Sequence, residues 1–198
     1  MATQCYSIIL AAGLSTRMGR CKASLPWIGG KPLLIYQVEQ LTQAGILPIV
    51  VLGTHNVSEW TQVLTTCTIV VNPYPHHGKT SSILLGLAAL SGNVDSLFIS
   101  AVDQPRPAWI YQTILDAHNA HGYASITVPV CRDRRGHPPL FSHCLLPNLT
   151  AIREDTLGLR QILHEFSAAV HTIEVNSTDI FLDLNTPETY HAEFLARS

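Results

Sequence analysis

The chain has 198 residues, of which 46% are hydrophobic and 13% are charged, and its formal net charge is -2. The length predicts one domain spanning residues 1–198, and the composition predicts a globular protein with a sizeable core rather than a disordered chain. Twelve Lys and Arg residues against fourteen Asp and Glu residues provide no basic surface, so we expect neither nucleic acid nor a membrane as a partner.

Hydropathy and cysteine spacing exclude further classes. The best apolar run, residues 46–53, contains a proline and falls well short of the roughly 18 residues of a membrane helix. The N-terminus lacks a basic region before its first apolar segment, so a cytoplasmic location is expected. The five cysteines are widely spaced, with no C-x-x-C pair, which predicts reduced thiols in or near the core rather than disulfides or a zinc site: Cys5, Cys21, Cys67, Cys131 and Cys144.

Short apolar runs alternate with longer segments of helical periodicity. Such alternation is typical of βαβ units, whose strands form a mostly parallel sheet covered by helices on both faces. We therefore predict an α/β fold with strands at residues 6–11, 48–52, 68–71, 96–101, 125–129 and 170–175 and helices at 32–44, 58–65, 81–90, 107–121, 158–166 and 187–196. Pro32, Pro107 and Pro187 suit first helical turns. The irregular stretch 131–156 is expected to be functional.

The first strand runs into a loop of small residues at 10–22, LAAGLSTRMGRCK. Backbone N–H groups of such a loop can hold phosphate, and Arg17 and Lys22 add positive charge. Gly13 and Gly19 are six residues apart, so the loop fits neither the dinucleotide fingerprint nor the Walker A motif. The pattern predicts an anion-binding loop, and the alternative is a plain turn with surface cations.

The pattern L-A-A-G-x-S-x-R-M-G-x-x-K resembles the signature of the MobA-like nucleotidyltransferases, in particular those of the MocA type, which are molybdenum cofactor cytidylyltransferases. This resemblance implies a three-layer α/β/α Rossmann-like fold with a mostly parallel mixed sheet. It also implies that Arg17 and Lys22 are catalytic, because they would offset the charge of a nucleotide triphosphate. The nucleotide-binding residues implied in the loop are Leu10, Ala11, Ala12, Gly13 and Ser15.

Asp103 directly follows the strand predicted at 96–101, within a D-Q-P tripeptide. Open α/β sheets bind ligands at the carboxyl ends of their strands, and Mg²⁺ is commonly held there by one or two carboxylates plus phosphate oxygens. The tripeptide is similar to the metal-binding motif of the same family. We expect Asp103 to bind Mg²⁺ and to be catalytic, with a helix N-cap as the alternative role.

Residues 181–188, FLDLNTPE, resemble the family segment D-x-D-T-P-E-D, whose acidic residue can complete the metal site. Asn185 stands where the second Asp usually lies, and Thr189 stands where the last acid lies. An amide oxygen can ligate Mg²⁺ but neutralises less charge, so the sequence leaves open whether Asp183 or Asn185 is the second ligand. Asn185 or Thr186 could also cap the last helix.

The segment at 72–82, NPYPHHGKTSS, joins a strand to a helix. It ends like a Walker A motif, but a proline replaces the required first glycine. The segment resembles the family loop N…G-x-x-x-S, which implies nucleotide contacts for Asn72, Gly78 and Ser82. Lys79 is either a further phosphate contact or a solvated lysine. The adjacent His76 and His77 are expected to point apart on an extended surface loop.

Two further segments resemble acceptor-side elements of the family. Residues 134–141, RRGHPPLF, are similar to G-x-P-x-x-F, and residues 154–160 are similar to G-D-x-G-A-R but lack its first glycine and its alanine. Guanidinium groups can pair with phosphate and stack on planar rings, although an exposed Arg-rich hairpin is the alternative. The acceptor contacts implied are Arg135, Gly136, His137, Asp155 and Arg160.

These resemblances imply transfer of CMP from CTP to the terminal phosphate of molybdopterin, with release of pyrophosphate and with Mg²⁺ as cofactor. The acceptor phosphate would attack in line, so no protein nucleophile is required. The family associates an alanine at position 12 with cytidylyl transfer, and a molybdoenzyme or its chaperone is a possible partner. The alternatives are a guanylyl- or sugar-phosphate nucleotidyltransferase of the same fold, a non-catalytic CTP-binding module, and a P-loop phosphotransferase that depends on Lys79 rather than Lys22.

Overall fold

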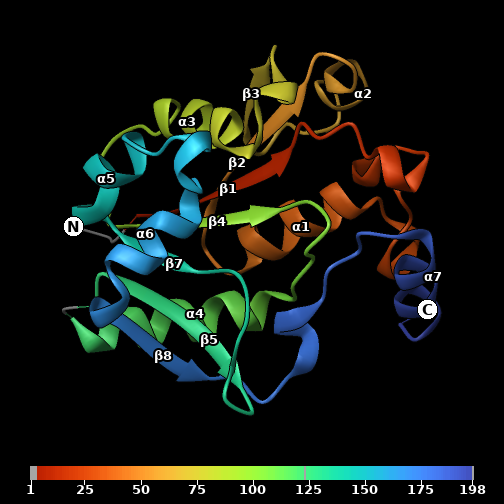
Figure 1. Ribbon diagram of the computed structural model, residues 1–198. Coiled ribbons are helices and arrows are strands. Elements are labelled where there is room, and N and C mark those ends of the chain that lie inside the picture. The colour runs from red at the N-terminus through yellow and green to blue at the C-terminus, as the bar shows by residue number, and fades with distance from the viewer. Residues whose placement is uncertain (1–3, 123, 198) are drawn as a thin grey trace.

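The computed structural model describes residues 4–122 and 124–197, apart from the side chain of Arg17. Its strands form one mixed sheet in the order β3-β2-β1-β4-β7-β5-β6, and β8 also pairs with β5 (Figure 1). The strands are β1 (Cys5–Ala11), β2 (Leu47–Gly53), β3 (Thr68–Asn72), β4 (Ser96–Ala101), β5 (Ile126–Cys131), β6 (Arg134–Arg135), β7 (Leu140–Ser142) and β8 (Val170–Glu174). The helices are α1 (Leu33–Gln43), α2 (Val57–Trp60), α3 (Lys79–Ala88), α4 (Ala108–His121), α5 (Leu146–Thr150), α6 (Leu159–Glu165) and α7 (Pro187–Leu195).

Apolar side chains cover both faces of the sheet, as the α/β prediction requires. One cluster packs α1 and α4 against one face, and a second packs α3, α5 and α6 against the other. Strands β3, β2, β1 and β4 are parallel neighbours, so their carboxyl ends lie at one edge. The predicted three-layer fold with a mostly parallel mixed sheet is confirmed.

A third, smaller cluster lies outside the two layers. It joins α7 to the segment after β1 through Leu25, Trp27 and Tyr190. Figure 1 shows α7, in dark blue, beside this red-orange segment. The C-terminal part of the chain is thereby fixed next to the loop that follows the first strand.

All six predicted strands and five of the six predicted helices occur within two residues of their expected ends. The exception is the helix predicted at 58–65, which ends at Trp60 and continues as hydrogen-bonded turns. Its second half is rich in β-branched Thr and Val residues, which are weak helix formers. The stretch 131–156 was expected to lack regular structure but contains β6, β7 and α5, which are too short to show a period in sequence.

The helix caps and cysteines also differ in part from expectation. Pro32 and Pro107 precede their helices as N-caps, and only Pro187 lies in a first turn. Cys144 is exposed, whereas Cys5 and Cys131 lie in the core. No helix in the described part of the chain is long and apolar enough to span a membrane.

Arg106 ties the carboxyl end of β4 to two distant segments. Its guanidinium is fully buried and donates to the carbonyl oxygens of Pro105, His137, Ile180 and Leu182 at 2.9 to 3.1 Å. Burial lowers the pKa of Arg106 to about 10, so the group stays charged at neutral pH. A buried charge is tolerated only when it is hydrogen-bonded, and here the carbonyls provide that compensation.

We expect Arg106→Met to lower the free energy of unfolding by roughly 3 kcal/mol or more, because it leaves several buried carbonyls without a donor. Urea denaturation at pH 7 measures this loss. The exposed Arg20 provides the control, since Arg20→Met should change the free energy by no more than about 0.5 kcal/mol. Equal stability of the two variants would contradict the structural role of Arg106.

Candidate functional site

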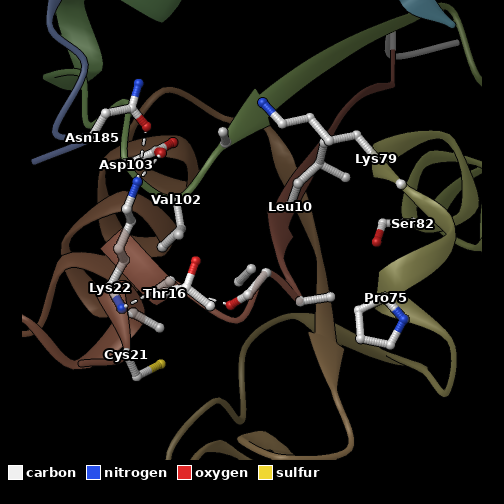
Figure 2. Close-up of a pocket in the computed structure, with 17 residues that line it drawn as sticks. Leu10, Thr16, Cys21, Lys22, Pro75, Lys79, Ser82, Val102, Asp103 and Asn185 are labelled. Carbon is white, nitrogen blue, oxygen red and sulfur yellow. Dashed lines mark hydrogen bonds and ion pairs between the residues drawn. The ribbon is translucent and has the colours of Figure 1, made fainter. Parts of the chain in front are cut away.

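A cavity of about 280 Å³ lies at the carboxyl ends of β1 and β4. This is the edge at which open α/β sheets bind ligands. The predicted site residues that line it are Leu10, Ala11, Ala12, Gly13, Ser15, Lys22, Gly78, Ser82, Asp103 and Asn185. Figure 2 shows Lys22, Asp103 and Asn185 on one side of the cavity, with Lys79, Ser82 and Pro75 on the other. The structure therefore brings four separate sequence motifs to one place.

Several lining residues had no assigned role in the sequence. They are Thr16, Cys21, Ala23, Pro75, Ala101 and Val102, and Lys79, for which two roles were open, lines the cavity as well. Thr16 and Cys21 belong to the loop at 10–22, so the predicted role of that loop was the sequence signal that could have identified them. Arg17 lies in this loop too, but its side chain is outside the described residues.

Lys22, Asp103 and Asn185 form one hydrogen-bonded group. The Lys22 Nζ donates to Asp103 Oδ2 at 2.6 Å and to Asn185 Oδ1 at 2.9 Å, as the dashed lines in Figure 2 show. The side chains of Lys22 and Asp103 are only 11% and 15% exposed. Two oxygens from different segments thus converge on a single cationic group.

The convergent oxygens fit the ligands that Mg²⁺ prefers. A second carboxylate, that of Asp183, lies nearby, and the backbone N–H of Leu184 donates to the Asp103 carbonyl at 2.9 Å. Asp183 Oδ1 is buried without a hydrogen-bond partner among the described residues. Burial, followed by the charge of Asp103, raises the pKa of Asp183. Carboxylate and amide oxygens of this kind could hold a hard divalent cation together with oxygens of a substrate.

No three His, Cys, Asp or Glu side chains within residues 4–122 and 124–197 form a ready-made metal site. A cation at Asp103 would therefore depend on the Asn185 amide and on ligand oxygens. Asn185 does not cap the last helix, because the Thr186 hydroxyl accepts from the backbone N–H of Thr189 instead.

Asn56 holds the first loop from behind and was missed in the sequence. Its buried side chain accepts from the Gly53 backbone N–H at 2.9 Å and donates to the Ala11 carbonyl at 3.0 Å. Gln37 has a similar role, since its Nε2 donates to the Val102 carbonyl at 2.6 Å. Side chains that bind backbone in this way fix the loops that border the cavity.

Asn72 does not line the cavity but orders the opposite wall. Its Nδ2 donates to the hydroxyls of Ser81 and Ser82 at 2.9 Å, and its Oδ1 accepts from the Tyr74 N–H at 2.8 Å. These bonds connect the end of β3 to the start of α3. Asn72, which was predicted to contact a nucleotide, therefore lies behind Ser82 and does not face the cavity itself.

The loop before α3 is compact rather than extended. Residues Pro75–His77 form a 3₁₀ turn, so the rings of His76 and His77 pack edge to face with centroids 4.4 Å apart. The Tyr74 ring stacks on His77 at 5.4 Å. The expectation that the two histidines point apart was wrong, because it assumed an extended backbone.

The predicted acceptor contacts lie outside the lining of this cavity. Arg135 is exposed on the hairpin of β5 and β6, Asp155 pairs with Arg153 at 3.1 Å, and Gly136 packs closely on Ile180. His137 is exposed to solvent on this segment. Desolvation by its neighbours, followed by the positive charge of Arg106, lowers the pKa of His137, and the negative charge of Asp183 opposes this shift.

The lowered pKa keeps His137 neutral at neutral pH. The cationic side chains of Lys79 and Arg160 and the carboxylate of Asp183 all lie within electrostatic range of His137.

Glu154 caps α3 from a distant turn. Its Oε2 accepts from the backbone N–H of Thr80 at 2.9 Å. Gly78 has a φ of 91°, and a Cβ there would lie 2.2 Å from the Glu154 carboxyl carbon, so a glycine is required. Hydrogen bonds from the hydroxyl and the backbone N–H of Thr80 lower the pKa of Glu154.

We expect Glu154→Ala to lower the free energy of unfolding at pH 7 by about 1 kcal/mol, as loss of a helix cap does. A carboxylate with a lowered folded pKa stabilises the protein above its unfolded pKa and loses this effect as the pH falls through the folded pKa. The difference between wild type and variant should therefore be constant from pH 7 to pH 5 and shrink toward pH 3. Urea denaturation across this range measures it, with Glu165→Ala, at an exposed position, as the control. A difference that grows on acidification would contradict the cap.

Comparisons with known proteins identify the family of this chain. The chain matches the MobA-like NTP transferase domain over residues 7–171. It is 28% identical over 187 residues to the molybdenum cofactor cytidylyltransferase of Escherichia coli, with 92% of each chain covered. It is 24% identical over 196 residues to a probable molybdenum cofactor guanylyltransferase of Bacillus mycoides, with 95% of this chain and 94% of that protein covered.

Structural similarity extends over the same length. The crystal structure of Rv0371c from Mycobacterium tuberculosis superposes with a TM-score of 0.83 at 25% identity, covering 98% of this chain and 99% of that chain. Its complex with manganese superposes with a TM-score of 0.78 at 22% identity, covering 98% and 100%. Because the family model spans most of the described sequence and the fold agrees, the chain belongs to the MobA-like NTP transferase family.

Proposed function

We propose that this chain transfers CMP from CTP to the terminal phosphate of molybdopterin, or its molybdenum-loaded form, and releases pyrophosphate. The observation that carries the proposal is the cavity that joins the small-residue loop after β1 to Lys22, Asp103 and Asn185. Backbone N–H groups, a lysine and oxygen ligands for a cation are the groups that nucleotidyl transfer needs, since it depends on positioning and charge stabilisation. The two relatives named as molybdenum cofactor transferases support the acceptor class.

The two walls of the cavity would have different roles. Loop 10–15 would hold the triphosphate through backbone N–H groups, while Lys22, together with Arg17, would offset its negative charge. Ser82 and Gly78 would face the ribose and base. Asp103 and Asn185 would hold Mg²⁺, which when bound supplies further neutralisation of the phosphates.

The side of the cavity near Lys79 and His137 would receive the acceptor. Lys79 and Arg160 are cationic side chains within electrostatic range of His137, and cations of this kind suit a phosphate-bearing ligand. An ionised acceptor phosphate needs no strong general base, and neutral His137 can offer a hydrogen bond without adding charge. Residues 172–197 contribute Asn185 to the cavity, so we infer that one domain carries the reaction.

The preference for CTP rests on Ala12, which lines the cavity and is 2% exposed. We expect CTP with Mg²⁺ to raise the melting temperature more than GTP, ATP or UTP, because only a ligand that binds the native state stabilises it. Ala12→Gly should narrow the difference between CTP and GTP, since it removes a methyl group from the wall. A larger shift with GTP in wild type would favour guanylyl transfer instead.

Pyrophosphate release from CTP in the presence of molybdopterin tests the reaction itself. Asp103→Asn should lower its rate roughly 100-fold or more, because the variant keeps the shape but removes the charge that holds the cation. Asp116→Asn, an exposed position on α4, is the matched control and should keep wild-type activity. Nucleotide binding without any turnover would instead indicate a non-catalytic binding module.

A further inference from the structure

The Lys22 ammonium occupies the space between the two oxygens assigned to a divalent cation. Its Nζ lies 2.6 Å from Asp103 Oδ2 and 2.9 Å from Asn185 Oδ1, and the side chains of Lys22 and Asp103 are largely buried. We propose that Lys22 is an internal counter-ion that keeps free divalent cations out of this site until a nucleotide draws the ammonium away. This inference rests on the proposed function and concerns the regulation of the same site.

The charges explain why a single lysine is sufficient to neutralise the pair of oxygens. Asp103 carries one negative charge, the Asn185 amide carries none, and Lys22 supplies one positive charge. A free divalent cation would have to compete with the ammonium for the Asp103 oxygen and would also be repelled by it. At a site this buried, such interactions are screened weakly by water and salt. The pair therefore holds the two oxygens in place and disfavours a cation that arrives alone.

Only the side chain of Lys22 has to move for the cation site to open, because its backbone is held in place. The backbone N–H of Lys22 donates to Ser15 Oγ at 3.3 Å, and Lys22 is the first residue of the 3₁₀ helix Lys22–Ser24. The stem of a lysine is flexible, and phosphates bound at loop 10–15 would offer its ammonium other anionic partners in the same cavity. Nucleotide and cation would then strengthen each other's binding, and this coupling must be reciprocal.

Lys79 provides an internal comparison. It lines the same cavity from the opposite wall, as Figure 2 shows, and it forms no salt bridge among the described residues. Lys31 is a second comparison, because it pairs with Glu39 at 2.6 Å but is about half exposed and lies outside the cavity. Substituting either lysine removes the same charge as substituting Lys22 without freeing Asp103.

The experiment measures Mn²⁺ binding by electron paramagnetic resonance of the free ion, first without nucleotide. Lys22→Met should bind Mn²⁺ about tenfold more tightly than wild type, while Lys79→Met and Lys31→Met should change the affinity no more than about threefold. Adding Asp103→Asn to Lys22→Met should abolish the gain. Lys22→Gln gives a second measurement if the methionine variant does not fold, and Lys22→Arg should resemble wild type.

The second arm repeats the titration with CTP. Wild type should bind Mn²⁺ at least about tenfold more tightly with CTP than without, and Lys22→Met should lose most of this coupling. Unchanged Mn²⁺ affinity in both Lys22→Met and Lys22→Gln, or an equal gain in Lys79→Met, would overturn the counter-ion role. If CTP does not bind wild type, the proposed function fails, whereas the titration without nucleotide still decides the role of Lys22.

Discussion

The buried guanidinium of Arg106 is the constraint on which the rest of the site depends. It is charged, lacks contact with water, and satisfies its hydrogen bonds on backbone carbonyls from three segments of the chain. Since leaving this charge unpaired would be costly, the carbonyls of His137, Ile180 and Leu182 must stay beside it. Asp183 and Asn185 follow directly after Leu182, so the same interaction sets where the C-terminal segment meets Asp103.

Around this point, the site combines a rigid backbone with movable side chains. Asn56, Asn72 and Glu154 each bind backbone groups that border the cavity, and none of the three side chains lines it. Such contacts pre-organise the N–H groups that a phosphate would meet. Lys22 and Lys79, in contrast, reach the cavity through long flexible stems, which allows their charges to follow a ligand.

The balance of charge distinguishes this chain from the pattern that it resembles. Asn185 has an amide where the family segment has an acid. Lys22 therefore balances the charge of Asp103 and Asn185 together, whereas a carboxylate at position 185 would leave the three side chains with a net negative charge. Asp183 retains a carboxylate beside this group, but burial and the charge of Asp103 disfavour its ionised form. Electrostatics at this edge of the sheet thus depend on a few groups whose charges nearly cancel.

Patterns among neighbouring residues were enough to place most helices and strands, and also the loop at 10–22 and Asp103 in the site. The loop at 10–22 and Asp103 follow strands with strong apolar signals, so their position at the carboxyl edge could be read from neighbouring residues. The short strands β6 and β7 and the 3₁₀ turn at Pro75–His77 could not, because two or three residues carry no periodicity.

The remaining features arise only from contacts between residues far apart in sequence. Lys22 meets Asp103 and Asn185 across 81 and 163 positions, and Glu154 meets Thr80 across 74. Such pairs leave no spacing pattern, since their geometry follows from how the sheet, its helices and the C-terminal segment pack together. Residue types and strand ends therefore indicate the chemistry that is present, and packing alone places Lys22 between the two oxygens.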